Sequence, residues 1–175
     1  SDLDLRVATL IGSAEVEVLL GGGVVGELHT AGVALLGLAP RWREARQTAS
    51  VRVIEWSEGT LAIALEAAAL GVDSQLWPSG PGTDLPAINP WLKEIADPFT
   101  GAPVVAVQAL EPDVAIIHAN GVDEHGNVYI AEDLVADEIL VRAAKRVIVT
   151  YEELVAPDPE RASISRLFVD DTIHV

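Results

Sequence analysis

Cysteine and methionine are both missing from the 175 residues of this chain. Without cysteine, the chain can form neither disulfide bonds nor a thiolate metal site. A chain that opens with Ser1 and lacks even an initiator methionine is a fragment, a processed protein, or one whose methionines are present in a modified form. His118 and His125 are potential metal ligands in one segment, but no third ligand is found at a suitable spacing. We therefore predict no metal site.

Basic residues are scarce. The 11 Lys and Arg residues stand against 27 Asp and Glu residues, which gives a formal net charge of -16. Proteins bind the phosphate backbone of nucleic acids through clustered cations. The composition therefore argues against a nucleic-acid partner.

Long apolar runs are also absent, although half of the residues are hydrophobic and the mean hydropathy is +0.32. A membrane span needs about 20 apolar residues, and the longest candidates, such as residues 33–39, reach half that length or less. No secretory signal peptide is recognisable. We predict a cytoplasmic protein without a membrane partner, whose surplus apolar surface is covered by another protein.

Segments typical of strands and helices alternate along the chain. Buried parallel strands read as near-continuous apolar runs, so this alternation predicts an α/β fold with a largely parallel sheet. The length fits a single domain over residues 1–175. The predicted strands are 16–20, 51–56, 104–107, 114–117, 128–130 and 147–149. The predicted helices are 41–49, 60–70 with Ser57 as N-cap and Gly71 at the end, and 133–146; residues 77–90 are predicted to be a loop.

The stretch ALEPDVAIIHANGVDEHGNVYI, residues 109–130, leaves an apolar strand, passes through a polar turn and returns to an apolar strand. Asp and Asn side chains bond their own backbone, and Gly126 can adopt a positive φ. Asp123, Gly126 and Asn127 are therefore predicted to close a tight turn. A contact with a partner protein or with the active site is the alternative interpretation of this turn.

Four segments carry a resemblance to a known family. In their order and spacing they resemble the alpha subunit of family I CoA-transferases, of the glutaconate CoA-transferase type, over roughly residues 35–170. The segments are EWSEGTLAIALEAAALGV (55–72), GPGTDLPAINPWLKEIADPFTG (80–101), the stretch 109–130 quoted above, and RAAKRVIVTYEELV (142–155).

This resemblance implies the CoA-transferase-like fold, which is shared with sugar-phosphate isomerases, with helices on both faces of a largely parallel sheet. It implies an acyl-CoA:carboxylate CoA-transferase that is active only with a beta subunit, as an alpha2beta2 or similar hetero-oligomer. Coenzyme A would be a substrate, and no cofactor would be tightly bound. The nucleophilic glutamate would lie on the beta subunit, and this chain would form one wall of the site.

The chain departs from the family pattern at two places. Members usually begin with a longer N-terminal segment that includes a glycine-rich loop, and that segment is expected to be lacking here unless residues 21–26 replace part of it. The Pro-Thr-Arg of the family is replaced by Leu76-Trp77-Pro78, which removes a cation that could meet a substrate carboxylate.

Glu58 is the candidate catalytic residue of this chain. It follows a strand end and lies in the first turn of a helix beside Gly59, where a carboxylate can face an acyl group. The resemblance adds that, in related ring-opening hydrolases of steroid degradation, an alpha-subunit glutamate in the matching segment is thought to be catalytic. The alternative is that Glu58 only complements the helix dipole or pairs with the N-cap.

A glycine-rich loop supplies the candidate substrate-binding residues. Their backbone N–H groups could contact a CoA or acyl oxygen, as in oxyanion holes, although no P-loop lysine follows. A simple connecting loop is the alternative interpretation. The candidates are Gly80, Gly82, Thr83 and Asp84.

Two further functions stay open beside CoA transfer. The chain could be the alpha subunit of a related CoA-dependent hydrolase that opens a ring by retro-Claisen cleavage, with Glu58 as the base. It could also be a non-catalytic structural subunit. The sequence does not identify the acyl group.

Overall fold

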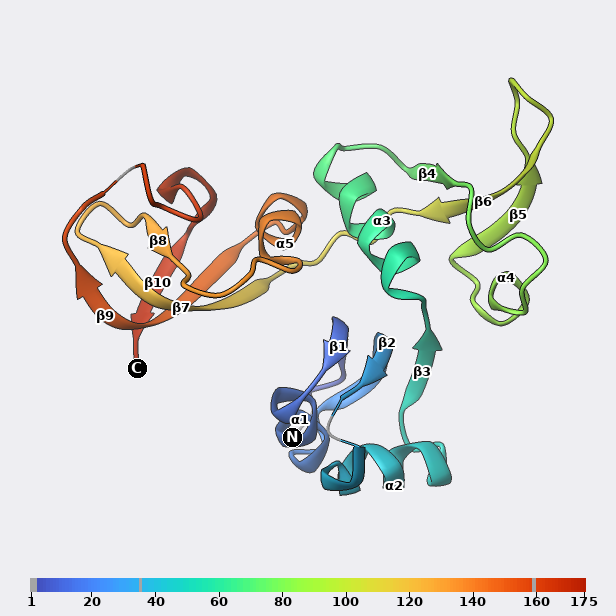
Figure 1. Ribbon diagram of the computed structural model, residues 1–175. Helices are drawn as coiled ribbons and strands as arrows, with labels where there is room; N and C mark the ends of the chain where they lie inside the picture. Colours follow the sequence, from blue (N-terminus) through green and yellow to red (C-terminus); the bar gives the residue numbers. More distant parts are fainter. Residues whose placement is uncertain (1–2, 35, 159) are drawn as a thin grey trace. The chain divides into compact units, whose positions relative to one another are not determined.

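The computed structural model describes residues 3–34, 36–158 and 160–175, which form strands and helices in alternation, except that four strands follow one another between residues 92 and 129 (Figure 1). The strands are β1 (Leu5–Gly12), β2 (Val25–Val33), β3 (Arg52–Glu55), β4 (Ser74–Trp77), β5 (Leu92–Ala96), β6 (Pro103–Gln108), β7 (Ala115–Asp123), β8 (Val128–Tyr129), β9 (Val147–Val155) and β10 (Asp171–His174). The helices are α1 (Ala14–Gly21), α2 (Pro40–Thr48), α3 (Glu58–Ala69), α4 (Leu85–Ile88) and α5 (Asp137–Ala143), with short 3-10 turns η1 (Leu36–Leu38) and η2 (Arg166–Phe168).

Contacts group the chain into two compact units. Unit 1 comprises Ser1–Ile63 and Ser74–Gln108, and unit 2 comprises Ala64–Asp73 and Ala109–Val175, so that α3 begins in unit 1 and ends in unit 2. Each unit has its own sheet with parallel strands. The single domain inferred from chain length stays a prediction.

Unit 1 contains a parallel sheet in the order β1-β2-β3 and a separate antiparallel sheet in the order β4-β6-β5. In the parallel sheet, Thr30 of β2 lies opposite Thr9 of β1 and Glu55 of β3. The carboxyl ends of these three strands therefore lie at one edge, which is where open α/β sheets bind their ligands.

Unit 2 contains the sheet β10-β9-β7-β8, in which β7, β9 and β10 are parallel and β8 is antiparallel to β7. The face that β7 and β9 bury packs against residues of α5 and of the segment near Ile164. The core residues are Ala115, Ile117, Ala119, Val122, Val128, Val141, Val147, Val149 and Ile164. The α/β class and the parallel strands are confirmed; the parallel strands are shared between two sheets, and a third sheet is antiparallel.

The strand predicted at residues 16–20 is wrong, because this segment belongs to helix α1. The sequence EVEVLL alternates like a strand, yet Val16 is buried at 1% exposure and Gly22 N–H bonds to the Val18 carbonyl at 3.0 Å. Gly23 ends this turn with a φ of 62°. Packing of Val16 in the core therefore outweighs a strand-like pattern that is only six residues long.

Other predicted elements occur with different bounds. Helix α5 is shorter than the predicted 133–146, and β7 and β9 extend beyond the predicted apolar runs. The region 77–90 contains the end of β4 and the single turn α4 as well as the predicted loop. Strands β1, β2, β4, β5 and β10 were not predicted.

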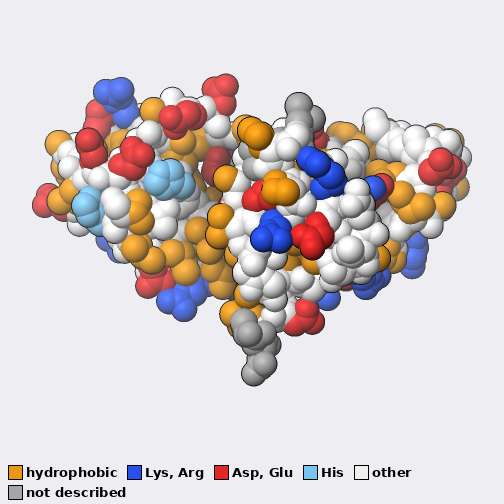
Figure 2. All heavy atoms as spheres, turned by 90° about the horizontal axis from the view of Figure 1, so that it is seen from below, with side chains coloured by type: hydrophobic (Ala, Val, Ile, Leu, Met, Phe, Trp, Pro, Cys, Tyr) orange, Lys and Arg blue, Asp and Glu red, His pale blue; other side chains and the backbone are white. Residues whose placement is uncertain are grey.

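Apolar side chains reach the surface in many places, and Figure 2 shows them in orange between the charged groups on one face. Phe99, Leu167 and Leu38 are 94%, 84% and 80% exposed. Across the part of the chain that the structure describes, no helix is long and apolar enough to cross a membrane.

Candidate functional site

The corner between β3 and α3 lies at the carboxyl edge of the parallel sheet in unit 1. Ser57 is the residue before α3, and its Oγ accepts a bond from Thr60 N–H at 3.1 Å. Thr60 Oγ1 in turn accepts from Ser57 N–H at 3.1 Å. This reciprocal pair is a capping box with threonine in place of the usual glutamate. Ser57 is therefore confirmed as the N-cap of this helix.

Glu58 is the first residue of α3, and its side chain is exposed. The cap is made by Ser57 and Thr60, so Glu58 is not needed to pair with the N-cap. Among the described residues, no hydrogen-bond or ion-pair partner of the Glu58 carboxylate is found. The carboxylate is thus available to an external group, at a helix end whose dipole stabilises its negative charge.

Trp77, the last residue of β4, lies against the first turn of α3. A Cβ added at Gly59 would lie 3.4 Å from the Trp77 ring. The half-buried indole is therefore a neighbour of the Glu58 corner. In the sequence, Trp77 comes shortly before the glycine-rich loop. Trp77 therefore places a flat apolar group beside the first turn of α3.

The loop at Gly80 to Asp84 turns through two glycines with positive φ, 109° at Gly80 and 76° at Gly82. Its backbone donors are partly used within unit 1: Gly82 N–H donates to Glu94 Oε2 at 3.0 Å, and Thr83 N–H donates to the Gly80 carbonyl at 3.1 Å. Asp84 ends the loop at the start of α4. The internal bonds at Gly82 and Thr83 fix the loop shape and occupy two of the donors proposed for a substrate.

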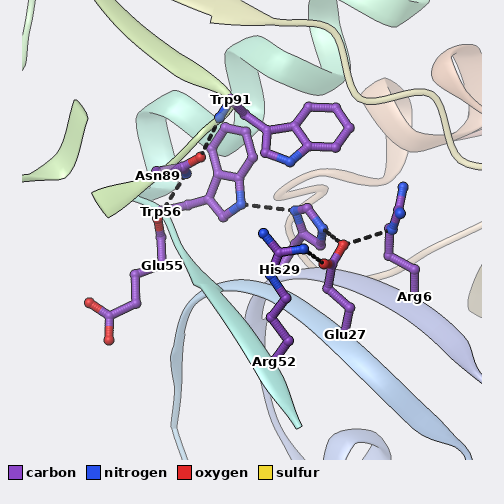
Figure 3. A network of polar contacts seen from close by, with 8 residues as sticks. All are labelled: Arg6, Glu27, His29, Arg52, Glu55, Trp56, Asn89 and Trp91. Atoms are coloured by element: carbon purple, nitrogen blue, oxygen red, sulfur yellow. Dashed lines mark hydrogen bonds and ion pairs between the residues drawn. The ribbon is translucent and has the colours of Figure 1, made fainter. Parts of the chain in front are cut away.

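A polar network includes Trp56, the residue that precedes Ser57 in the corner (Figure 3). His29 of β2 is 0% exposed, and its Nδ1 accepts a bond from the Trp56 indole N–H at 3.1 Å. Its Nε2 lies 2.8 Å from Glu27 Oε1. Glu27 also pairs with Arg6 at 2.7 Å and with Arg52 at 3.0 Å, so the network joins all three parallel strands.

Asn89 and Trp91 complete this network. The Asn89 side chain, 1% exposed, donates to the Glu55 carbonyl at 2.9 Å and accepts from Trp91 N–H at 2.9 Å. The Trp91 ring meets His29 edge-on with centroids 5.4 Å apart, and the Trp56 ring at 6.3 Å. Two indoles therefore enclose the imidazole.

Burial lowers the pKa of His29, because a charged imidazole is disfavoured away from water; the bond to Glu27 opposes this shift without cancelling it. Burial by itself would raise the pKa of Glu27, but the bond from His29 and the charges of Arg6 and Arg52 lower it below its ordinary value. The network is thus stable with a neutral histidine and an ionised glutamate.

The polar turn of unit 2 is built around Asp123, which is 2% exposed. Its carboxylate accepts bonds from His125 N–H and Asn127 N–H, both at 2.9 Å, from Asn127 Nδ2 at 2.8 Å and from Tyr129 OH at 2.9 Å. Gly126 has a φ of 88°. The turn borders a cavity of about 410 Å³, but the carboxylate of Asp123 is fully used in closing the turn.

Metal ligation has no geometric support in the described ranges 3–34, 36–158 and 160–175, which hold no group of three His, Cys, Asp or Glu side chains suited to a metal. His118 instead bonds Thr150 Oγ1 at 3.0 Å. His125 lies 3.9 Å from its neighbour Glu124.

Sequence reasoning did not find the residues that support the corner. Glu27 and His29 interrupt the apolar pattern of a strand, and Asn89 lies in a segment that reads as loop. The i, i+2 spacing of Glu27 and His29 was an available signal, since it places both side chains on one face of a strand. Glu94, which holds the glycine-rich loop, reads as an ordinary surface residue.

Curated relatives match most of the chain. A 3-oxoadipate CoA-transferase subunit of Pseudomonas knackmussii is 34% identical over 157 residues, 87% of this chain and 56% of the relative. The cholesterol ring-cleaving hydrolase IpdA subunit of Rhodococcus jostii is 29% identical over 190 residues, 98% of this chain and 63% of the relative. The chain therefore spans less than two thirds of the length of these relatives.

Solved structures agree closely with the fold. The decarboxylase AibA/AibB superposes with a TM-score of 0.88 at 32% identity and covers 99% of this chain and 67% of that chain. Glutaconate coenzyme A-transferase from Acidaminococcus fermentans superposes with a TM-score of 0.87 at 26% identity, over 98% of this chain and 62% of that chain.

The sequence profile described as Coenzyme A transferase matches residues 6–174, nearly the whole chain. The resemblance seen in the sequence is thus confirmed by the profile, by the relative from the 3-oxoadipate CoA-transferase and by the glutaconate CoA-transferase structure. The chain belongs to the coenzyme A transferase family and is of its alpha-subunit type.

Proposed function

We propose that this chain is the alpha subunit of a heteromeric enzyme that moves coenzyme A between an acyl-CoA and a carboxylic acid. The family match over residues 6–174 is the observation that carries this proposal. The exposed Glu58 carboxylate at the carboxyl edge of the parallel sheet supports it. A beta subunit completes the site, in an alpha2beta2 or similar assembly located in the cytoplasm.

The reaction is a double exchange at a carboxylate nucleophile, which we assign to a glutamate of the beta subunit. Its oxygen attacks the thioester carbonyl, the C–S bond breaks, and a mixed anhydride and a CoA thiolate form. The thiolate attacks the glutamyl carbonyl, which gives a glutamyl-CoA thioester and releases the first acid as a carboxylate. The incoming carboxylate reverses these two steps and leaves as a new acyl-CoA.

This chain supplies one wall of that site. Glu58 assists by its charge or by proton transfer, and Trp77 packs against the acyl or pantetheine portion. Gly80, with the backbone around Gly82, Thr83 and Asp84, shapes the loop beside it. Phosphates of CoA fall mainly to the beta subunit or to backbone amides, because this chain has only 11 Lys and Arg residues against 27 Asp and Glu residues.

A ring-opening hydrolase is the second candidate. The 29% identical relative named as a cholesterol ring-cleaving hydrolase subunit favours it, and Glu58 would then act as the base toward water. The 32% identical decarboxylase shows that proteins of this fold are not confined to CoA transfer. A direct assay therefore has to separate these reactions.

The test uses the co-expressed alpha and beta subunits incubated with acyl-CoA alone. CoA transfer predicts that a glutamyl-CoA thioester accumulates on the beta subunit, where hydroxylamine cleaves it and peptide mass locates it. Glu58→Gln should slow turnover by about 10²-fold, because it removes a group that assists by charge or proton transfer, without abolishing the adduct.

Glu66→Gln is the matched control, since this exposed glutamate lies on the same helix about two turns later and loses the same charge. It should leave turnover unchanged. Two results together would indicate hydrolysis instead of transfer. No adduct would form on either chain, and Glu58→Gln would lose the limb of the pH–rate profile that belongs to a base. Wild-type turnover in Glu58→Gln would leave Glu58 as a residue that only complements the helix end.

A further inference from the structure

The bonding of His29 fixes its tautomer. An indole nitrogen can only donate, so His29 Nδ1 must be the acceptor of the 3.1 Å bond from Trp56. The proton therefore sits on Nε2 and is donated to Glu27 Oε1 at 2.8 Å. Both ring nitrogens of a fully buried histidine are used, and one of them serves Trp56.

Glu27 is itself held in place. Arg6 of β1 and Arg52 of β3 approach its two carboxylate oxygens from either side at 2.7 and 3.0 Å. The carboxylate therefore has a fixed orientation, and it fixes the orientation of the imidazole plane. Figure 3 shows this order, from the arginines through Glu27 and His29 to the indole of Trp56.

Trp56 lies two residues before Glu58, and its own position is fixed on both sides. Its backbone N–H donates to the Thr30 carbonyl at 3.1 Å, while its indole is held by His29. The preceding residue, Glu55, is bound through its carbonyl by buried Asn89 at 2.9 Å. The chain that enters the Glu58 corner is thus held by three bonds from outside β3 and α3.

We infer that His29 is a positioning residue: through the Trp56 indole it sets where the Ser57–Glu58 corner places the Glu58 carboxylate. It touches no reacting atom itself. The inference rests on the proposed function for the role of Glu58, whereas the placement of the corner can be measured independently. A histidine that only stabilised the core would not need to bind the Trp56 indole, a group that can only donate, next to the corner. Nor would it need the Glu27 carboxylate, which arginines of two other strands hold in place.

The experiment compares His29→Asn with His29→Leu, two side chains of similar size. Asn places its Oδ1 near the former Nδ1 and can still accept from the indole, whereas Leu cannot. Trp56→Phe removes the donor and keeps a ring, which gives a milder variant if His29→Leu folds poorly. All are made in the co-expressed complex, with hydrogen exchange of the Thr60 and Leu61 amides as the structural measurement.

We expect His29→Leu and Trp56→Phe to speed exchange at these amides about tenfold or more, and His29→Asn to stay near wild type. In the assay, kcat should fall about tenfold in the first two with KM nearly unchanged, because orientation of a catalytic group affects kcat. The double variant with His29→Leu and Trp56→Phe should have a kcat no lower than that of either single variant. His29→Asn should retain most of the wild-type kcat.

Unchanged exchange at Thr60 and Leu61 in His29→Leu would overturn the positioning role. A lowered melting temperature with wild-type kcat, measured well below that temperature, would reduce His29 to a stability residue. If Glu58→Gln retains full activity, the proposed role of Glu58 fails, and the exchange measurement still decides whether His29 sets the corner.

Discussion

At the scale of single residues, Asp123 shows how burial and hydrogen bonding compete. Burial by itself would raise the pKa of this carboxyl group. The bonds from Asn127, Tyr129 and His125 outweigh burial and lower the pKa from 3.8 to about 2. Asp123 therefore stays ionised through bonds from backbone N–H, amide and hydroxyl groups, and it acts as the fixed acceptor around which β7 returns into β8.

Gly126 is the residue of this turn whose backbone conformation is demanding. Its φ of 88° strains any branched side chain. Gly126→Val should lower the free energy of unfolding by more than about 1 kcal/mol, measured by urea unfolding of the co-expressed complex. Asn127→Ala, which removes the 2.8 Å bond to Asp123, should affect stability more than turnover.

Gly37→Val is the control for that prediction, since a Cβ there meets nothing within 4 Å and its φ is not in the left-handed range. It should change stability by no more than about 0.5 kcal/mol. Loss of activity in Gly126→Val with an unchanged unfolding curve would move this turn from the scaffold into the active site.

The two polar clusters differ in how far the sequence predicts them. Asp123, Gly126 and Asn127 act through local turn chemistry, so their order in the chain is enough to predict the turn. Glu27 and His29 act through partners distant in the sequence, such as Trp56 and, across the sheet, Arg52. Their meaning depends on strand register, which the apolar pattern alone does not specify.

At the scale of elements, helix starts show the same division between local and distant causes. Helix α3 is capped by Ser57 and Thr60, which are neighbours in sequence, and its start was predictable. Helix α2 has Ala39 at its N-cap position and no side-chain cap there. Instead, Glu17 of α1 accepts bonds from Arg41 N–H at 3.0 Å and Trp42 N–H at 2.7 Å. A cap contributed by another helix cannot be recognised from the local sequence.

The polar network that joins β1, β2 and β3 through Arg6, Glu27, His29 and Arg52 predicts a pH dependence of stability. Burial lowers the pKa of His29 below its ordinary value of 6.5, so the unfolded chain takes up the proton more readily than the folded chain does. Stability should therefore fall as the pH drops below about 6.5. The charged groups that face His29 are Glu27, Arg6 and Arg52, and the arginines keep their charge throughout this range.

His29→Asn should remove this slope, as measured by urea unfolding between about pH 7.5 and about pH 5. The lowered pKa values of Glu27 and Asp123 act in a separate window. Their stabilising contribution is present above their ordinary values of 4.5 and 3.8 and is lost as the pH falls below them. An equal slope in wild type and His29→Asn would mean that His29 does not resist protonation in the folded protein.

At the scale of the whole molecule, the alternation of apolar segments predicted the α/β class and the family motifs predicted the alpha-subunit type, but neither predicted how the strands divide among sheets. The antiparallel sheet β4-β6-β5 depends on a hairpin turn at Asp97, whose side chain accepts from Phe99 N–H at 2.9 Å and Thr100 N–H at 2.7 Å. Its strand β5 is mostly exposed, and Leu92 is its one buried residue. A strand with so few buried residues has no apolar pattern to reveal it.

Exposed apolar side chains predict how the chain behaves by itself. Phe99, Leu167 and Leu38 are almost fully exposed, in a chain that is half hydrophobic. Such surface favours association, even though a net charge of -16 keeps copies of the chain apart at low salt. Expressed without a beta subunit, the chain should therefore self-associate or aggregate, increasingly so as salt screens its charge, and it should show no acyl-CoA turnover.

Sedimentation at low and high salt measures the self-association of the isolated chain, with the co-expressed alpha and beta subunits as the control. The complex should sediment as one species at both salt concentrations, because the partner covers apolar surface that the isolated chain leaves in water. A monodisperse monomer that turns over acyl-CoA by itself would contradict both the dependence on a partner and the assignment of the nucleophile to the beta subunit. A monodisperse but inactive monomer would contradict only the association, since a site without its nucleophile is inactive in either state.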